Sequence, residues 1–244
     1  MYKNLSSTLG IGLLFWLLTA CLNNNSAPPS AAEQKEKSFL TDEDTSLPQS
    51  PGSLEKVEET DPDGNVLNFT RRKKDSLREG IFIKTNKKGL KLEQANYRNG
   101  KLEGHRVLFH PNGDTMIVET RRNDLFEGEY KSFYPSGQLK MTCQYRNNNI
   151  EGAWLQYYET GQLKEEVLFV NNAENGPFKE YHLNGQLSVE GAYKDGANEH
   201  GPLKFYDEQG VHNKTMECKM GVCRTIWKLE NEKGSKSKKS KRQK

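Results

Sequence analysis

The sequence predicts an all-β chain that folds as an extended meander, or solenoid, of about six to seven β-hairpin repeats of 24 residues. Glycine recurs at a fixed interval, and a second glycine follows each of these nine residues later. The leading glycines are Gly80, Gly104, Gly128, Gly152, Gly176 and, after 25 residues, Gly201. The following glycines are Gly89, Gly113, Gly137, Gly161, Gly185 and Gly210. A fixed period of this size is typical of repeat architectures, in which each unit is stabilised by its neighbours.

Each unit has the pattern of a hairpin. A short aromatic run is followed by a polar turn such as Pro135-Ser136-Gly137, where glycine supplies the positive φ of a tight turn. A second turn of the Asn99-Gly100 kind returns the chain to the next unit. We interpret both sets of glycines as turn residues. The second strand alternates, and its apolar side chains form the expected buried stripe: Leu139, Met141, Tyr145, Leu163, Val167, Phe169, Leu187, Val189 and Tyr193.

The chain opens with a targeting segment. Residues 1–20 contain Lys3 and an apolar run from Leu9 to Leu18, which is short for a membrane span but suits a secretory signal. The run ends in Leu-Thr-Ala-Cys21, which resembles the bacterial lipoprotein signal. That resemblance implies cleavage before Cys21, lipid on that cysteine and a place in the cell envelope, with the outer membrane favoured. An uncleaved anchor and a simple signal peptide are the alternatives.

Composition divides the remaining chain. Residues 21–55 are rich in Asn, Ser, Pro and Glu and are expected to form a disordered linker. Residues 56–79 form a degenerate capping repeat, with its turn at Asp61-Pro62-Asp63-Gly64, and residues 80–230 form the repeat domain.

Residues 231–244 are a basic tail that is expected to be disordered. Lys233 and the residues after it carry seven cations and no acid, against a net charge of +3 for the whole chain. Such a tail favours anionic lipids or glycans. Export argues against nucleic acid as a partner, and a purely solubilising role is the alternative.

Cys218 and Cys223 are predicted to form a disulfide. If Met220-Gly221 is a two-residue turn, the cysteines occupy the first non-hydrogen-bonded pair beyond it, which brings their Cα atoms close. A metal or redox pair is the weaker alternative, because the spacing fits neither. Cys143 lies on the apolar face and is expected to be a buried hydrophobe.

The sequence holds none of the common catalytic signatures, so we expect no enzyme, no cofactor and no metal site. Recurrent aromatic residues are the candidate binding surface, although packing explains their recurrence more simply: Trp154, Tyr157, Tyr158, Tyr134 and Tyr181.

The unit resembles the MORN-repeat family, and more closely the variant repeats of bacterial YwqK-type antitoxins. Residues 56–224 carry the pattern through Tyr97, Gly100 and Gly104 and their equivalents. The sequence departs at Arg121, which replaces the tyrosine, at Asn148, which replaces the turn glycine, and by one extra residue before Gly201. The resemblance implies a hairpin solenoid that binds proteins or membranes.

The leading hypothesis is a lipid-anchored envelope protein, without enzymatic activity, whose sheet is a scaffold for another envelope protein. Two alternatives remain open. One is an immunity or antitoxin-like factor, and the other is a surface module that binds glycan or lipid.

Overall fold

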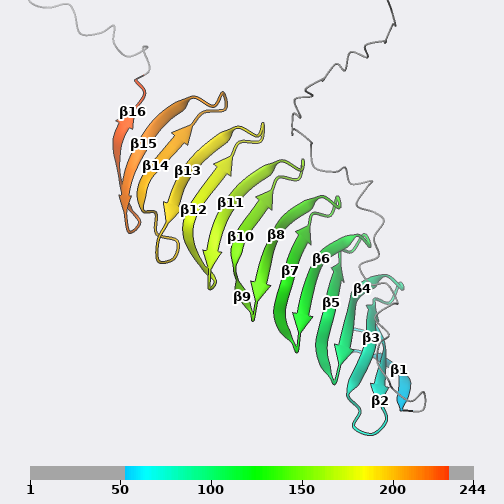
Figure 1. The fold of residues 1–244 in the computed structure, drawn as a ribbon. Helices are drawn as coiled ribbons and strands as arrows, with labels where there is room; N and C mark the ends of the chain where they lie inside the picture. The colour runs from blue at the N-terminus through cyan, green and yellow to red at the C-terminus, as the bar shows by residue number, and fades with distance from the viewer. Residues whose placement is uncertain (1–52, 231–244) are drawn as a thin grey trace, which may run out of the picture.

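The computed structural model describes residues 53–230, which form one open antiparallel sheet (Figure 1). The first eight strands are β1 (Leu54–Thr60), β2 (Val66–Arg72), β3 (Arg78–Thr85), β4 (Lys91–Arg98), β5 (Lys101–Phe109), β6 (Thr115–Arg122), β7 (Leu125–Phe133) and β8 (Leu139–Arg146). The others are β9 (Asn149–Ile150), β10 (Gly152–Tyr157), β11 (Leu163–Val170), β12 (Ala173–Tyr181), β13 (Leu187–Tyr193), β14 (Gly201–Tyr206), β15 (His212–Lys219) and β16 (Val222–Lys228).

Strands that follow one another in sequence lie side by side, from β1 at one end of the sheet to β16 at the other (Figure 1). The short β9 pairs only with β8 and lies off this path. The all-β meander of hairpins that the glycine period predicts is therefore confirmed. The β1–β2 hairpin, with a turn at Asp61–Gly64, precedes the first full unit at the place expected for the capping repeat.

The connections between strands lie along the two long sides of the sheet, and the two sides differ. Two-residue turns form most of the first side, which we call the turn edge, with longer connections within the described residues only at 73–77 and 194–200. Both residues of each two-residue turn have positive φ, as at Asn147 (48°) and Asn148 (67°). Asparagine tolerates this conformation, so Asn148 replaces the turn glycine without changing the turn. Five-residue loops form the second side, which we call the loop edge: residues 61–65, 86–90, 110–114, 134–138, 158–162, 182–186 and 207–211.

The interpretation of the leading glycines as turn residues is wrong, because they lie at bulges within or at the start of strands. Between β11 and β12, for example, the register shifts between Val167 and Phe169, opposite the segment that contains Gly176. Gly176 has φ of 123°, and a Cβ there would lie 2.7 Å from the side chain of Leu168. A bulge with positive φ needs glycine, and this need explains the 24-residue period.

Apolar side chains gather on one face, which we call the core face. One cluster surrounds Phe69, Phe82 and Ala95 near the first strands, and a second surrounds Val167, Phe178, Leu203 and Cys218. Phe169, Val189 and Tyr193 pack against the second cluster, as the stripe predicts. Leu139, Leu163 and Leu187 do not belong to either cluster, because a register shift beside each interrupts the alternation.

Candidate binding surfaces

Side chains on the loop edge tie each repeat to the next. The hydroxyl of Tyr134 donates a hydrogen bond to the carbonyl of Tyr157 at 2.9 Å, and that of Tyr158 donates to the carbonyl of Tyr181 at 2.8 Å. His110 and His182 occupy the same position in their units, and their Nε2 atoms lie 3.0 Å from a carbonyl of the next repeat. These four side chains fix each repeat against the next one.

Carboxylates tie the repeats together on the turn edge. A glutamate precedes each of the first four leading glycines and accepts the backbone N–H of an asparagine in the next turn, 20 residues on: Glu79 from Asn99, Glu103 from Asn123, Glu127 from Asn147 and Glu151 from Asn171, at 2.9–3.1 Å. The sequence interpretation missed this role. The signal was present, because the Glu-Gly pair recurs four times with the 24-residue period.

The predicted aromatic surface is divided by the fold. Tyr134 and Tyr158 form the loop-edge ties, and Trp154 packs against the core cluster. Burial, and then the charge of Glu166, raises the pKa of Tyr157, and the same carboxylate acts on Tyr181. Glu166 follows Glu165 in β11 and therefore lies on the other face of the sheet. The five aromatic residues do not make one platform.

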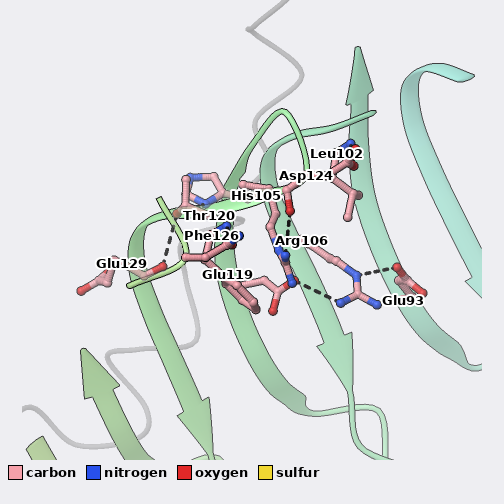
Figure 2. Close-up of polar contacts among 11 residues, drawn as sticks. Glu93, Leu102, His105, Arg106, Glu119, Thr120, Asp124, Phe126 and Glu129 are labelled. Carbon is pink, nitrogen blue, oxygen red and sulfur yellow. Dashed lines mark hydrogen bonds and ion pairs between the residues drawn. The ribbon is translucent and has the colours of Figure 1, made fainter. Parts of the chain in front are cut away.

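One cross-strand pair on the core face is charged where the equivalent pairs of other repeats are apolar or uncharged. The uncharged pairs are Phe82–Ala95, Tyr130–Cys143, Trp154–Val167, Phe178–Gly191 and Leu203–Met216. The charged pair is Arg106–Glu119 (Figure 2). Glu119 is 3 % exposed, so a carboxylate is buried in the middle of the apolar stripe.

One oxygen of this carboxylate accepts from two arginines. Arg106 donates to Glu93 at 2.7 Å and to Glu119 at 3.1 Å, and Arg121 donates to the same oxygen of Glu119 at 2.8 Å. Burial acts to lower the pKa of Arg106, but the hydrogen bonds with the two glutamates outweigh it and the pKa lies above its ordinary value. Arg121, where the repeat's tyrosine is missing, also lies over the ring of Phe126 at 3.3 Å. The cluster is neutral and satisfied, which indicates a structural role.

The core face of the later repeats carries a group of carboxylates around one tyrosine. Phe178 and Tyr193 stack with centroids 4.3 Å apart, and four carboxylates act on Tyr193, those of Glu174, Glu165, Glu199 and Glu180. We call these six residues the aromatic–acidic patch. Within residues 53–230, none of the four carboxylates forms an ion pair.

The environment of the patch raises the pKa of two of its residues, Tyr193 and Glu165. Burial, and then the four carboxylates, raises the pKa of Tyr193 to about 12. Glu165 lies directly opposite Glu180 across β11 and β12, and burial followed by the charge of Glu180 raises the pKa of Glu165. Like charges directly opposite one another destabilise a sheet. A cationic group laid across the patch would relieve that repulsion.

Two of the described cysteines form a disulfide, and the third is a buried free thiol. Met220 and Gly221 form a turn with positive φ, Cys218 lies opposite Cys223, and a disulfide joins them with Cα atoms 4.0 Å apart. Cys143 is 2 % exposed, and burial raises its pKa to about 11. A thiol with so high a pKa is a poor nucleophile at neutral pH, which agrees with a packing role.

Cys21, the signal, the linker and the basic tail lie outside the described residues. Between Ser53 and Glu230, no group of three or more His, Cys, Asp or Glu side chains is placed to hold a metal ion. The same segment has no helix that is long and apolar enough to cross a membrane.

A family model described as MORN repeat variant matches residues 126–147, 150–171 and 174–195. These segments coincide with the hairpins from β7 to β13, each match ending at or close to a two-residue turn or the loop that replaces it. The search of curated proteins gives no match to the chain. The chain therefore carries three consecutive MORN-variant repeats between residues 126 and 195.

Proposed function

We propose that this protein is a lipid-anchored component of a bacterial cell envelope, without enzymatic activity, whose repeat sheet binds another envelope protein. The MORN-variant repeats indicate a repeat-based binding module. The lipoprotein-like sequence that ends at Cys21 supports the anchor, and an outer-membrane location follows from the same resemblance. Multiple acyl chains on one cysteine would make the attachment stable where a single chain would not.

The observation that carries the binding proposal is the aromatic–acidic patch. A protein that leaves Glu165 and Glu180 facing one another, half-buried and without an ion pair among the described residues, retains an electrostatic cost within its own fold. A partner with lysine or arginine side chains removes that cost on binding. Tyr193, which is half-buried and stacks on the buried ring of Phe178, adds an aromatic surface on which aliphatic stems and guanidinium groups pack.

The sheet is long and has a single layer, so a partner meets it along its length. The patch spans the strands from β11 to β13, together with Glu199 just before β14. We infer that the partner presents a basic, extended segment to this part of the core face.

In-cell crosslinking of the full-length protein, followed by mass spectrometry, tests this function. We expect one envelope protein to be captured by the wild type and lost with Cys21→Ala, which lacks the lipid. The same partner is expected to be lost with Glu165→Gln combined with Glu180→Gln.

The matched control is Glu166→Gln, which removes a carboxylate from the other face of the same strand. We expect it to capture the partner as the wild type does. Capture that is equal for the patch variant and the wild type contradicts binding at the patch. Recovery of lipid or glycan alone, with no protein, contradicts the scaffold function.

A further inference from the structure

The last strand of the sheet is an open edge with exposed apolar side chains. β16 pairs with β15 and has no neighbour on its other side within the described residues. Val222 is 78 % exposed, Ile226 55 % and Trp227 43 %, and Leu229, just after the strand, is 46 % exposed. A strand of this kind is a template for pairing with another chain.

The edge strand at the other end of the sheet, β1, is built differently. β1 carries Glu55, Lys56, Glu58 and Glu59 among its seven residues, and none of its side chains is an exposed large hydrophobe. Charged side chains on an edge strand discourage pairing with other strands. Both β1 and β16 are edge strands, but only β16 exposes large apolar side chains.

The register of the last hairpin shows which backbone groups of β16 are free to pair. Lys219 and Val222 close the two-residue turn, so hydrogen-bonded and non-hydrogen-bonded pairs alternate from there along the strand. The pairs Cys218–Cys223 and Met216–Thr225 are of the second kind, and the 4.0 Å Cα separation of the cysteines agrees with this. The N–H and C=O groups of Cys223 and Thr225 consequently point away from β15.

Charge decides what kind of strand fits this edge. The segment from Lys219 to Leu229 contains Lys219, Arg224 and Lys228 and no acidic residue, and the sequence that follows Glu232 is basic. A second copy paired through β16 would bring two basic strands together. An acidic strand with apolar side chains complements both the charges and the exposed Val222 and Ile226.

We propose that the outer edge of β16 is a docking site for an extended, acidic and apolar segment of another protein, which adds to the sheet as a further strand. The disulfide at Cys223 fixes β16 to β15 and so presents the edge as a rigid template. The register shift at Ile226 limits regular pairing to the residues near Val222–Thr225, so the docked segment is short. This site is separate from the aromatic–acidic patch and does not depend on it.

A synthetic ten-residue peptide that alternates valine with glutamate tests the site, with binding to the purified full-length protein followed by fluorescence polarisation. We expect the peptide to bind, and Thr225→Pro to weaken binding about tenfold or more. Proline removes an N–H that points to the peptide and not to β15, so the hairpin keeps its own bonds. Thr225→Val keeps the N–H and is expected to bind as the wild type does.

Two further arms separate strand pairing from simple charge attraction. An N-methylated peptide with the same side chains is expected not to bind, because its backbone donors are blocked. Arg224→Glu with Lys228→Glu leaves the backbone intact and is expected to weaken the valine–glutamate peptide about tenfold. This second variant also keeps the test decisive if Thr225→Pro does not fold.

Several results overturn the proposal. These are failure of the valine–glutamate peptide to bind the wild type, equal binding of the N-methylated peptide, and equal binding by the Arg224→Glu, Lys228→Glu variant. Sedimentation that shows a dimer dissociated by Thr225→Pro, but not by Thr225→Val, also overturns it, because a second copy then occupies the edge.

Discussion

Replacing Arg106 by alanine tests whether the charged pair on the core face is structural. Arg106 bridges Glu93 and Glu119, at 2.7 and 3.1 Å, and the side chain of Glu119 is only 4 % exposed (Figure 2). Without Arg106, the carboxylate of Glu119 keeps one partner, Arg121. Breaking a buried ion pair costs about 3–5 kcal/mol, and the remaining arginine places this case near the lower end, at about 3 kcal/mol.

The assay is thermal unfolding followed by far-UV circular dichroism. A change of about 1 kcal/mol shifts Tm by about 2–4 °C in a protein of this size, so we expect a decrease of about 6–12 °C. The matched control is Lys204→Ala, which breaks the cross-strand pair with Glu190. The side chain of Lys204 is 45 % exposed, and an exposed pair contributes about 1 kcal/mol or less.

A double substitution tests whether the loss of stability comes from leaving Glu119 with one partner fewer, and not from the loss of an arginine at this position. Arg106→Trp with Glu119→Val copies Trp154 and Val167, the equivalent pair two repeats on. A buried ion pair replaced as a whole by apolar side chains often leaves stability unchanged or higher, so we expect the double variant to be more stable than Arg106→Ala. A Tm for Arg106→Ala no lower than that of Lys204→Ala would refute the reasoning.

Three further predictions follow from contacts and pKa directions. Tyr158→Phe removes the bond to the carbonyl of Tyr181 and should lower the free energy of unfolding by about 1 kcal/mol in urea titrations, whereas Tyr157→Phe, with no such tie, should change it less. Cys143, with its pKa raised to about 11, should resist iodoacetamide at pH 8 in the folded protein and react in urea; equal rates would contradict its burial. The pKa of Tyr193, about 12, is raised above its unfolded value near 10, so folding favours the protonated form. The protonated Tyr193 therefore contributes fully to the free energy of unfolding below about pH 10, and this contribution is lost between about pH 10 and 12. Tyr193→Phe should flatten the pH dependence of stability in that window.

The repeat period, the hairpin turns and the pairing of Cys218 with Cys223 follow from local rules. A two-residue turn fixes the register of the strands beside it, so the partner of a nearby residue is known once the turn is found. The face of the sheet that carries Val167 and Phe169 follows from the alternation of side chains along one strand in the same way.

Other assignments depend on residues 20 or more positions apart. Trp154 and Tyr158 are both recurrent aromatic residues of one repeat, yet Trp154 packs on the core face whereas Tyr158, just after β10, is a tie at the loop edge. Nothing in the pattern of one repeat distinguishes them, because the carbonyl that Tyr158 reaches belongs to the next repeat.

The sequence by itself determined the unit, its length and its turns, because these depend on backbone conformation over a few neighbouring residues. The tertiary structure decided that the leading glycines form bulges, that Glu79 and its equivalents hold the next turn, and that Arg121 joins a buried ion cluster. It also decided where charge stays unbalanced, around Tyr193, and where the sheet ends in an open edge, at β16. Both depend on which side chains stacking brings together, and stacking is a property of the whole array.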